Sequence, residues 1–232
     1  MRIFVAGATG ATGSVFVPEA TRAGLELVLH VRPKTAVSSP LAGDPRARVF
    51  ELDDLPALAD ALSGSEAIVS FVGTMRDRFK AGDTYASSDV GSTRALADGA
   101  RRAGVPRFLL LSSVGAGGAG AYLKMKAECE AIVRDSRLRW TVFHPSVLVT
   151  PEGATAGSHG ARRAPPMFGG LLGALGALPG LAGFADDYKP IPLDVLVWAF
   201  LQVLEWPKDG AVLTGRELWA LGARRRAEDQ SR

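Results

Sequence analysis

The stretch GATGATG at residues 7–13 decides how the fold is interpreted, because its glycines recur at every third position directly after the apolar run IFVA. The apolar run predicts a buried strand, and residues 13–24 predict a helix that closes at Gly24. Gly7, Gly10 and Gly13 therefore stand where a strand becomes a helix. Glycine tolerates positive φ and lets the backbone approach a ligand closely.

A turn of this kind points its main-chain N–H groups and a helix N-terminus at an anion, and a dinucleotide pyrophosphate suits it. The spacing GxxGxxG differs from the fingerprint GxGxxG only in its first interval. We expect Gly7 to form the turn, Gly10 to approach the phosphates and Gly13 to let the helix pack closely. The remaining candidate contacts of the turn are Thr9, Ala11 and Thr12, the threonines through their hydroxyl groups. The alternative is a tight turn without a ligand.

Short apolar runs alternate with amphipathic stretches over the first two thirds of the chain. Strands are predicted at residues 2–7, 26–32, 46–53, 66–73, 107–113 and 139–145, and helices at 13–24, 55–64, 91–105 and 122–136. This alternation predicts an α/β, Rossmann-type doubly wound parallel sheet. We expect residues 1–150 to form an NAD(P)-binding core. Residues 151–232 would add small substrate-side segments that complete the same single domain, including a helix within 189–206.

Composition excludes several classes of protein. The net charge of +3, from 27 basic and 24 acidic residues, is too small to indicate a nucleic-acid partner. The run 224–226 of three arginines lies in a polar tail and is interpreted as a solvated, frayed terminus. The single cysteine, Cys129, has no partner for an intrachain disulfide, which suits a reducing compartment, and we expect it to pack within a helix. No cluster of histidine, cysteine and carboxylate has the spacing of a metal site.

The N-terminus lacks the pattern of a signal peptide, so a cytoplasmic location is expected. Residues 167–184 are uncharged, but six glycines and Pro179 make a spanning helix a poor interpretation. A lid over an apolar pocket or an interface segment fits this stretch better, and the apolar C-terminal third favours a homodimer.

The second predicted strand ends in Arg32, where NAD-preferring sites carry a carboxylate that binds the ribose hydroxyls. Glu26 begins the same strand and therefore points to the wrong end. Arg32 offers a planar fork of donors that suits a 2′-phosphate, and Lys34 could assist. NADP(H) is therefore favoured over NAD(H). The alternative is a solvated arginine that merely follows a strand.

Other candidates fall at the carboxyl ends of parallel strands, where ligands of this fold bind. Asp53 or Asp54 could meet the adenine, although Asp54 could instead cap the next helix. The segment Val72, Gly73 and Thr74 follows the fourth strand and lets the backbone lie against the cofactor.

Tyr122 and Lys126 are spaced i, i+4 and share one face of a predicted helix. A free tyrosine titrates near ~10, and a neighbouring ammonium favours its phenolate. Tyr122 could then exchange a proton with a carbonyl or alcohol oxygen while hydride moves at a nicotinamide. Lys126 could also bind the nicotinamide ribose, and Ser112 or Ser113 could hold the reacting oxygen. The alternative is an exposed amphipathic turn.

Together, GATGATG, SSVGA, YLKMKAECE and TVFHPSVLV resemble the atypical short-chain dehydrogenase/reductases. More narrowly, the chain is similar to the NAD(P)H-binding oxidoreductases related to the HIV Tat-interacting protein, and more distantly to NmrA-like proteins. The resemblance extends over nearly the whole chain. It implies a Rossmann fold with NADPH along the glycine turn, Tyr122 as proton donor or acceptor, Lys126 as its partner, and Ser112 or Ser113 as the hydroxyl.

The resemblance does not imply a substrate, because the group includes reductases and proteins that mainly sense the nicotinamide pool. We expect an oxidoreductase acting on the carbonyl/alcohol pair of a small apolar substrate, or alternatively a non-catalytic redox sensor. One departure concerns the sixth strand, where similar proteins carry Arg-Pro and this chain carries His144 and Pro145. Pro145 is expected beside the cofactor. His144 is either a second titrating group or a packing replacement for the arginine.

Overall fold

The computed structural model describes residues 1–73, 84–149 and 187–230, with side chains up to residue 223. The strands are β1 Arg2–Ala6, β2 Glu26–Val31, β3 Ala47–Val49, β4 Ala67–Ser70, β5 Arg107–Leu111, β6 Arg139–Phe143, β7 Leu148–Val149, β8 Ile191–Pro192 and β9 Ala211–Leu213. The α-helices are α1 Ala11–Arg22, α2 Pro33–Ala36, α3 Leu55–Leu62, α4 Gly91–Ala103, α5 Ala121–Asp135, α8 Leu193–Glu205 and α9 Gly215–Gln230. A 3-10 turn, η1, spans Pro40–Gly43, and a π-helical turn, η3, spans Tyr85–Val90. No helix in these described ranges is long and apolar enough to cross a membrane.

A seven-stranded sheet in the order β3-β2-β1-β4-β5-β6-β9 forms the centre of the molecule. Every neighbouring pair in it is parallel. The chain runs outward from β1 to β3 and then returns to β4 on the other side of β1, so the strand order reverses between β1 and β4. These features confirm the predicted doubly wound sheet, and the reversal marks where such sheets bind ligands.

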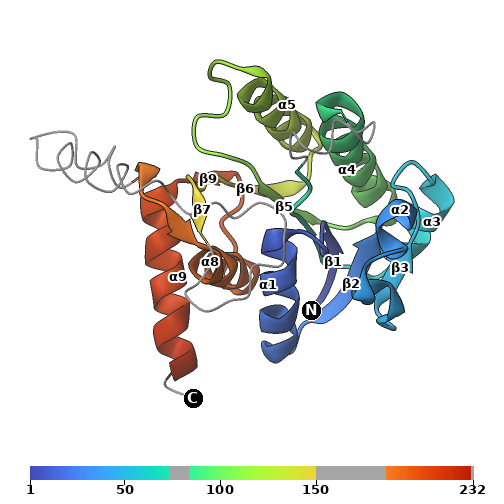
Figure 1. Ribbon diagram of the computed structural model, residues 1–232, viewed down its shortest axis with the longest axis horizontal. Coiled ribbons are helices and arrows are strands. Elements are labelled where there is room, and N and C mark those ends of the chain that lie inside the picture. Colours follow the sequence, from blue (N-terminus) through green and yellow to red (C-terminus); the bar gives the residue numbers. More distant parts are fainter. Residues whose placement is uncertain (74–83, 150–186, 231–232) are drawn as a thin grey trace, which may run out of the picture.

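Helices cover both faces of the sheet, as Figure 1 shows. The helices α3, α4 and α5 pack on one face, where their apolar residues join those of the strands in one core cluster. The helices α1 and α8 cover the other face and form a second cluster with the opposite side chains of the strands. Because both faces are covered, the strands are nearly continuous apolar runs, which is the pattern that predicted them.

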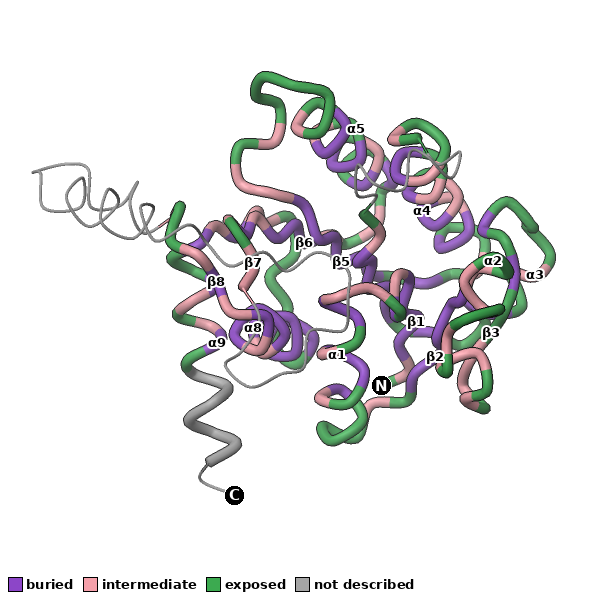
Figure 2. The backbone as a smooth tube through the Cα atoms, viewed as in Figure 1, coloured by how far each residue is buried: buried purple, intermediate pink, exposed green. Residues whose placement is uncertain are grey.

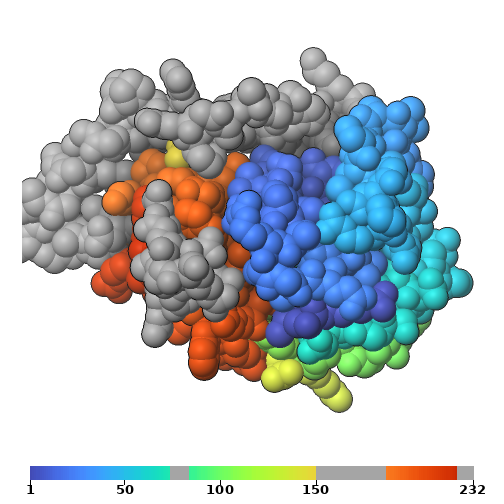
Figure 3. All heavy atoms as spheres, turned by 90° about the horizontal axis from the view of Figure 1, so that it is seen from below, coloured from blue at the N-terminus to red at the C-terminus, as the bar shows by residue number. Residues whose placement is uncertain are grey.

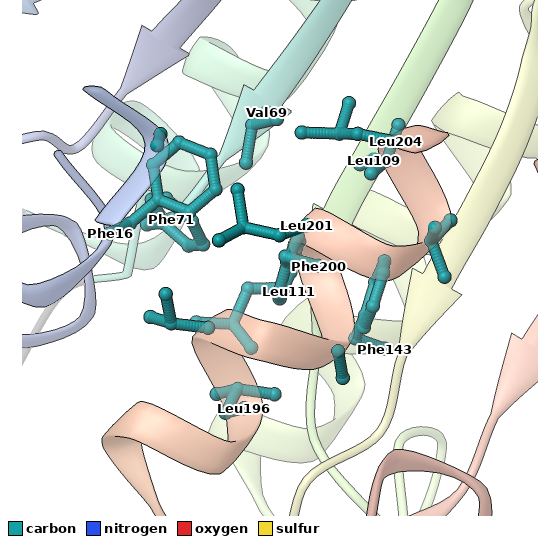
Figure 4. Packing of buried hydrophobic residues seen from close by; sticks show 14 of the residues in the cluster. Phe16, Val69, Phe71, Leu109, Leu111, Phe143, Leu196, Phe200, Leu201 and Leu204 are labelled. Carbon is teal, nitrogen blue, oxygen red and sulfur yellow. The ribbon is translucent and has the colours of Figure 1, made fainter. Parts of the chain in front are cut away.

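The helix α8 lies between the sheet and α9, and Figure 2 colours it as buried along most of its length. Phe200 stacks on Phe143 of β6 with ring centres 3.6 Å apart, and its ring centre lies 5.0 Å from that of Phe71. Figure 4 shows Phe200 on α8 between Phe71 and Phe143, within one cluster of buried side chains. Seen from below in Figure 3, α1 and α8 lie side by side over this core.

The C-terminal end is more regular than the sequence indicated. A strand, β9, extends the sheet beside β6, and α9 continues to Gln230, so the expected frayed tail around residues 224–226 is wrong. The reason is packing on α8. A Cβ atom on Gly222 would lie 2.4 Å from the carbonyl oxygen of Val195, so α9 approaches α8 at a distance that only glycine permits. Leu218 is fully buried in the same core cluster.

His30 is a core residue, as the sequence predicted. Its ring lies on β2 between Phe4 and Phe50, and its Nε2 is 2.9 Å from the carbonyl oxygen of Phe50. Burial lowers the pKa of His30 from 6.5 to about 4, against the raising effect of the hydrogen bond to Phe50 and aided by the charge of Arg32. The folded protein therefore holds this imidazole neutral.

This burial predicts a loss of stability in acid. The unfolded chain takes up the proton as the pH falls below 6.5, whereas the folded chain does so only near pH 4. The contribution of His30 to the free energy of unfolding is complete above pH 6.5 and should fall by about 3 kcal/mol by pH 4. A His30→Phe variant keeps an aromatic ring that cannot titrate. Its free energy of unfolding in urea should fall less between neutral pH and pH 4 than that of the natural chain, and an equal fall would contradict the prediction.

Candidate dinucleotide and active site

The glycine turn joins β1 to α1 at the point where the strand order reverses. Gly7 has a φ of +80°, and a Cβ atom there would lie 2.8 Å from the carbonyl carbon of Phe71, which follows β4. A Cβ on Gly13 would lie 2.3 Å from the carbonyl oxygen of Gly7. The predicted roles of both glycines are therefore confirmed in structural terms: Gly7 makes the turn, and Gly13 lets α1 close on it.

The N-terminus of α1 is arranged as an anion site. Gly10 is the N-cap residue, has no side chain to accept from the first-turn N–H groups, and uses its own N–H on the carbonyl of Gly7 at 3.0 Å. The N–H groups of the first turn are thus left for a ligand. Thr9 is exposed and Ala11 half-buried, whereas Thr12, in the first turn of α1, is buried. This backbone cradle fits a pyrophosphate.

Two basic residues stand at the carboxyl end of β2. Arg32 directly follows the strand and precedes the short helix α2, which contains Lys34. Both residues make interactions within the protein. Glu26 lies at the opposite end of β2, exposed, with its Oε1 3.5 Å from the Nε of Arg2. The only side chains with the sign that suits a phosphate at this strand end, among residues 26–36, are therefore Arg32 and Lys34.

The remaining candidates fall around the sheet edge in different settings. Asp54 caps α3, because its Oδ1 accepts from the N–H of Ala57 at 3.1 Å, so the capping interpretation is confirmed. Asp53 is exposed beside it. The candidates after β4 and β6 differ in exposure: Val72 is half-buried, Gly73 exposed and Pro145 buried, and Thr74 lies outside the described residues.

Tyr122 and Lys126 lie on the first turns of α5, as the spacing predicted. The Nζ atom of Lys126 is 5.8 Å from the centre of the Tyr122 ring and 3.3 Å from the carbonyl oxygen of Leu111, to which it donates. Lys126 is buried, whereas Tyr122 is 36% exposed. A Cβ on Gly73 would lie 3.7 Å from the same Nζ, so the segment after β4 lies beside this pair.

The two serines after β5 differ sharply. Ser112 is only 4% exposed, and its hydroxyl donates to Oε1 of Glu130 on α5. Ser113 is half-buried, and its hydroxyl lies 3.3 Å from the carbonyl oxygen of Val114. The hydroxyl of Ser112 therefore already donates its hydrogen to Glu130. The hydroxyl of Ser113 makes only a long contact with the next residue.

Glu130 is the centre of a cluster that the sequence did not indicate. Its Oε1 accepts from Ser112 and also from Nε2 of His144 at 2.6 Å, and its Oε2 accepts from Arg134 at 2.8 Å. Burial acts to raise the pKa of Glu130, but the hydrogen bonds from His144 and Ser112 and the charges of His144 and Arg134 outweigh it. The pKa of Glu130 therefore lies below its usual value. Because an ionised carboxylate only accepts, the Nε2 of His144 carries a hydrogen.

A second residue that the sequence did not indicate is Tyr85, in the π-helical turn η3. Its ring centre lies 6.1 Å from that of Tyr122 at an interplanar angle of 59°. The turn is fixed by a reciprocal cap between Thr84 and Ser87. Glu130 repeats at i+4 from Lys126, and that spacing is the signal that could have drawn attention to it. Nothing in the sequence joins Tyr85 to Tyr122.

The fold and the glycine cradle together define a dinucleotide-binding protein of Rossmann type. The chain belongs to the NAD(P)H-binding family, whose pattern it matches over residues 7–169. It is similar to Protein HTATIP2 of Rattus norvegicus, with 30% identity over 152 residues, 63% of this chain and 62% of that protein. It is also similar to the Arabidopsis thaliana uncharacterized protein At2g34460, chloroplastic, with 26% identity over 63% of this chain and 59% of that protein. The match thus spans about three fifths of either relative's length.

Solved structures agree on the fold. A short-chain dehydrogenase/reductase superfamily protein from Agrobacterium tumefaciens, with bound NAD, is 19% identical with a TM-score of 0.64, over 92% of this chain and 76% of that one. DesIV, a dTDP-glucose 4,6-dehydratase from Streptomyces venezuelae solved with NAD, is 23% identical with a TM-score of 0.66, over 100% of this chain and 83% of that one. These comparisons bear out the resemblance to atypical short-chain dehydrogenase/reductases and NmrA-like proteins. The chain is an NAD(P)H-binding protein with a Rossmann-type fold.

Proposed function

We propose that this protein is an NADP(H)-dependent oxidoreductase that acts on the carbonyl/alcohol pair of a small apolar substrate. The observation that carries the proposal is the position of Tyr122 and Lys126, an exposed phenol and a buried ammonium 5.8 Å from the ring centre, beside the segment after β4. Lys126 donates to the carbonyl oxygen of Leu111 at the carboxyl end of β5, and the glycine cradle follows the carboxyl end of β1 in the same parallel sheet. A bound nicotinamide cofactor would supply or accept the hydride.

The protein's own residues would handle the proton and the reacting oxygen. Tyr122 would donate a proton to the carbonyl oxygen or take one from the alcohol, and the positive charge of Lys126 would stabilise the phenolate left after donation. Of the two candidate serines, Ser113 suits the contact with the reacting oxygen, because the hydroxyl of Ser112 is buried on Glu130. Lys126 would also bind the nicotinamide ribose. Pro145, Val72 and Gly73 would line the cofactor, and Asp53 would face the adenine.

A first experiment tests whether the protein binds a nicotinamide cofactor, which both the oxidoreductase and the redox-sensor hypotheses require. Calorimetric titration of the purified protein with NADPH should give micromolar affinity, and the same protein should then consume NADPH with one or more members of a panel of small apolar aldehydes and ketones. If neither NADPH nor NADH binds, the glycine turn is only a turn and the proposal fails. Binding without turnover across the panel would favour the alternative, a redox sensor.

The cofactor preference gives a separate prediction. If Arg32 holds a 2′-phosphate, NADH should bind at least tenfold more weakly than NADPH, a difference of about 1.4 kcal/mol. Arg32→Ala should remove most of this difference, because it should weaken the binding of NADPH and leave the binding of NADH nearly unchanged. Calorimetry on both cofactors measures the two affinities. The matched control is Arg101→Ala on α4, an exposed arginine paired with Asp98, which should change neither affinity. Equal affinities in the natural chain would overturn the preference.

The structural relatives raise one further candidate, because DesIV is a dehydratase that was solved with NAD. An isomerase or epimerase that retains its cofactor would use the same cradle and the same tyrosine. A reaction without net consumption of NADPH would identify it. The comparison shows only the fold at this level of identity, so the oxidoreductase remains the first proposal.

A further inference from the structure

The carboxylate of Glu130 joins three parts of the molecule that meet at the candidate active site. Ser112 follows β5, His144 follows β6, and Glu130 itself belongs to α5. Glu130 is 2% exposed, and both Ser112 and His144 donate to its Oε1 atom. The second oxygen, Oε2, accepts from Arg134 one turn further along α5. The carboxylate is thus buried, ionised and held on all sides by donors.

A second contact fixes the same helix to the same strand end. Lys126 lies one turn before Glu130 and donates to the carbonyl oxygen of Leu111, the residue before Ser112. The segment Leu111 and Ser112 is therefore held by α5 at two successive turns, once by Lys126 and once by Glu130. Tyr122 lies one turn before Lys126, so its position depends on how α5 sits on this strand end.

We propose that Glu130 is a positioning residue for the Tyr122–Lys126 site, and that His144 and Ser112 hold it in that role. Only the expected effect of Glu130 on turnover rests on the proposed function. The position of α5 that Glu130 would hold is a property of the protein without cofactor or substrate. Glu130 would fix α5 against the ends of β5 and β6, and so keep the ammonium of Lys126 beside the Tyr122 ring.

The arrangement differs from that of a hydrolytic triad. In such a triad the histidine accepts the proton of the serine and the carboxylate orients the histidine. Here Ser112 and His144 donate to the same carboxylate oxygen, so the histidine does not activate the serine. The buried cluster therefore links α5 to the ends of two strands. Removing one partner of a buried charge lowers the stability of a protein, because the remaining charge is left without a partner.

A chemical probe of Tyr122 tests the proposal without any substrate. Tetranitromethane nitrates tyrosine through its phenolate, and the chain contains three tyrosines. Tyr122 and Tyr188 are equally exposed, at 36% each, so Tyr188 serves as an internal reference. Peptide mass spectrometry gives the ratio of the two nitration rates. Glu130→Gln removes the charge at nearly constant shape, and Glu128→Gln makes the same change at an exposed position of the same helix.

We expect the ratio of Tyr122 to Tyr188 nitration to fall by about threefold or more in Glu130→Gln, because the ammonium of Lys126 is no longer held beside the Tyr122 ring. Glu128→Gln should leave the ratio unchanged. An unchanged ratio in Glu130→Gln would overturn the proposal. A raised ratio would overturn it as well, since loss of a negative charge acting only through space favours the phenolate.

His144 provides the second variant, which keeps the proposal testable should Glu130→Gln fold poorly. His144→Arg supplies a permanent cation that can donate to Glu130, whereas His144→Leu supplies no donor. The ratio should stay near its natural value in His144→Arg and fall in His144→Leu. Equal ratios in the two variants would count against a positioning role.

Turnover separates this proposal from the proposed function. If NADPH is consumed, Glu130→Gln should lower kcat, whereas Glu128→Gln should leave kcat unchanged. If no carbonyl compound is reduced by the natural chain, the proposed function fails, but the nitration ratio still decides whether Glu130 positions Tyr122.

Discussion

Replacing Tyr122 by Phe is expected to lower turnover about a hundredfold or more while the affinity for NADPH stays within about twofold. The substitution removes only the hydroxyl, so the ring, its contact with Tyr85 and the nearby ammonium of Lys126 all remain. The proton needed by the reacting oxygen would then come only from water. Steady-state consumption of NADPH with the best carbonyl compound of the panel, together with calorimetry, measures both quantities.

Tyr188→Phe is the matched control for this experiment, because Tyr188 has the same exposed fraction of 36%. It should change neither turnover nor NADPH affinity. If Tyr122→Phe retains the turnover of the natural chain, Tyr122 is not the proton donor. Should any biological effect of the protein survive Tyr122→Phe intact, the sensor hypothesis would gain support, since a sensor needs the cradle and not the phenol.

Substitution of Gly13 by Ala should damage both the fold and the cofactor site. The new Cβ would lie 2.3 Å from the carbonyl oxygen of Gly7 and 2.7 Å from the Cα of Ala8, and neither backbone atom can move aside freely. Overpacking of this kind costs about 3 kcal/mol, which corresponds to a fall in Tm of roughly 10 °C. Displacing the N-terminus of α1 should also lower the affinity for NADPH by about a hundredfold. Thermal unfolding and calorimetry measure the two effects.

Substitutions of two other glycines by Ala serve as comparisons for Gly13→Ala. A Cβ on Gly43 has no heavy atom within 4 Å, and its φ is not in the left-handed region, so Gly43→Ala should leave Tm and NADPH affinity unchanged. A Cβ on Gly10 would meet only the Gly7 oxygen, at 3.3 Å, so Gly10→Ala should have an intermediate effect. If Gly13→Ala were as stable as Gly43→Ala, the close packing of α1 on the turn would not be a constraint.

The sheet could be predicted because its strands are buried on both faces and its first turn is marked by glycine. Continuous apolar runs such as 108–111 fit only a covered sheet, and alternation with helices fixes its parallel direction. The strand β9 was missed because Ala211–Leu213 has only three residues, too few to show a strand pattern. The helix α9 was missed because its charged residues suggested a tail, whereas Gly222 and Leu218 attach it to α8.

The candidate site was predictable where a local pattern exists. The spacing of Tyr122 and Lys126 places them on one helix face, and Asp54 stands where a helix cap is expected. Arg134 lies at i+4 from Glu130 on the same helix, but the contacts of Glu130 with Ser112 and His144 were not predictable, because those residues follow two different strands, β5 and β6. The sequence also left Ser112 and Ser113 equivalent, and only the fold distinguishes the buried hydroxyl from the half-buried one.

The position of α8 has a consequence for the order in which the chain can fold. Phe200 packs against Phe16, Phe71 and Phe143, which come from α1, the end of β4 and β6. During synthesis the ribosome therefore releases most of the sheet before the helix that covers one of its faces exists. Until α8 emerges, that apolar face has to be shielded by chaperones or by transient collapse, so we infer that the final domain forms late in translation.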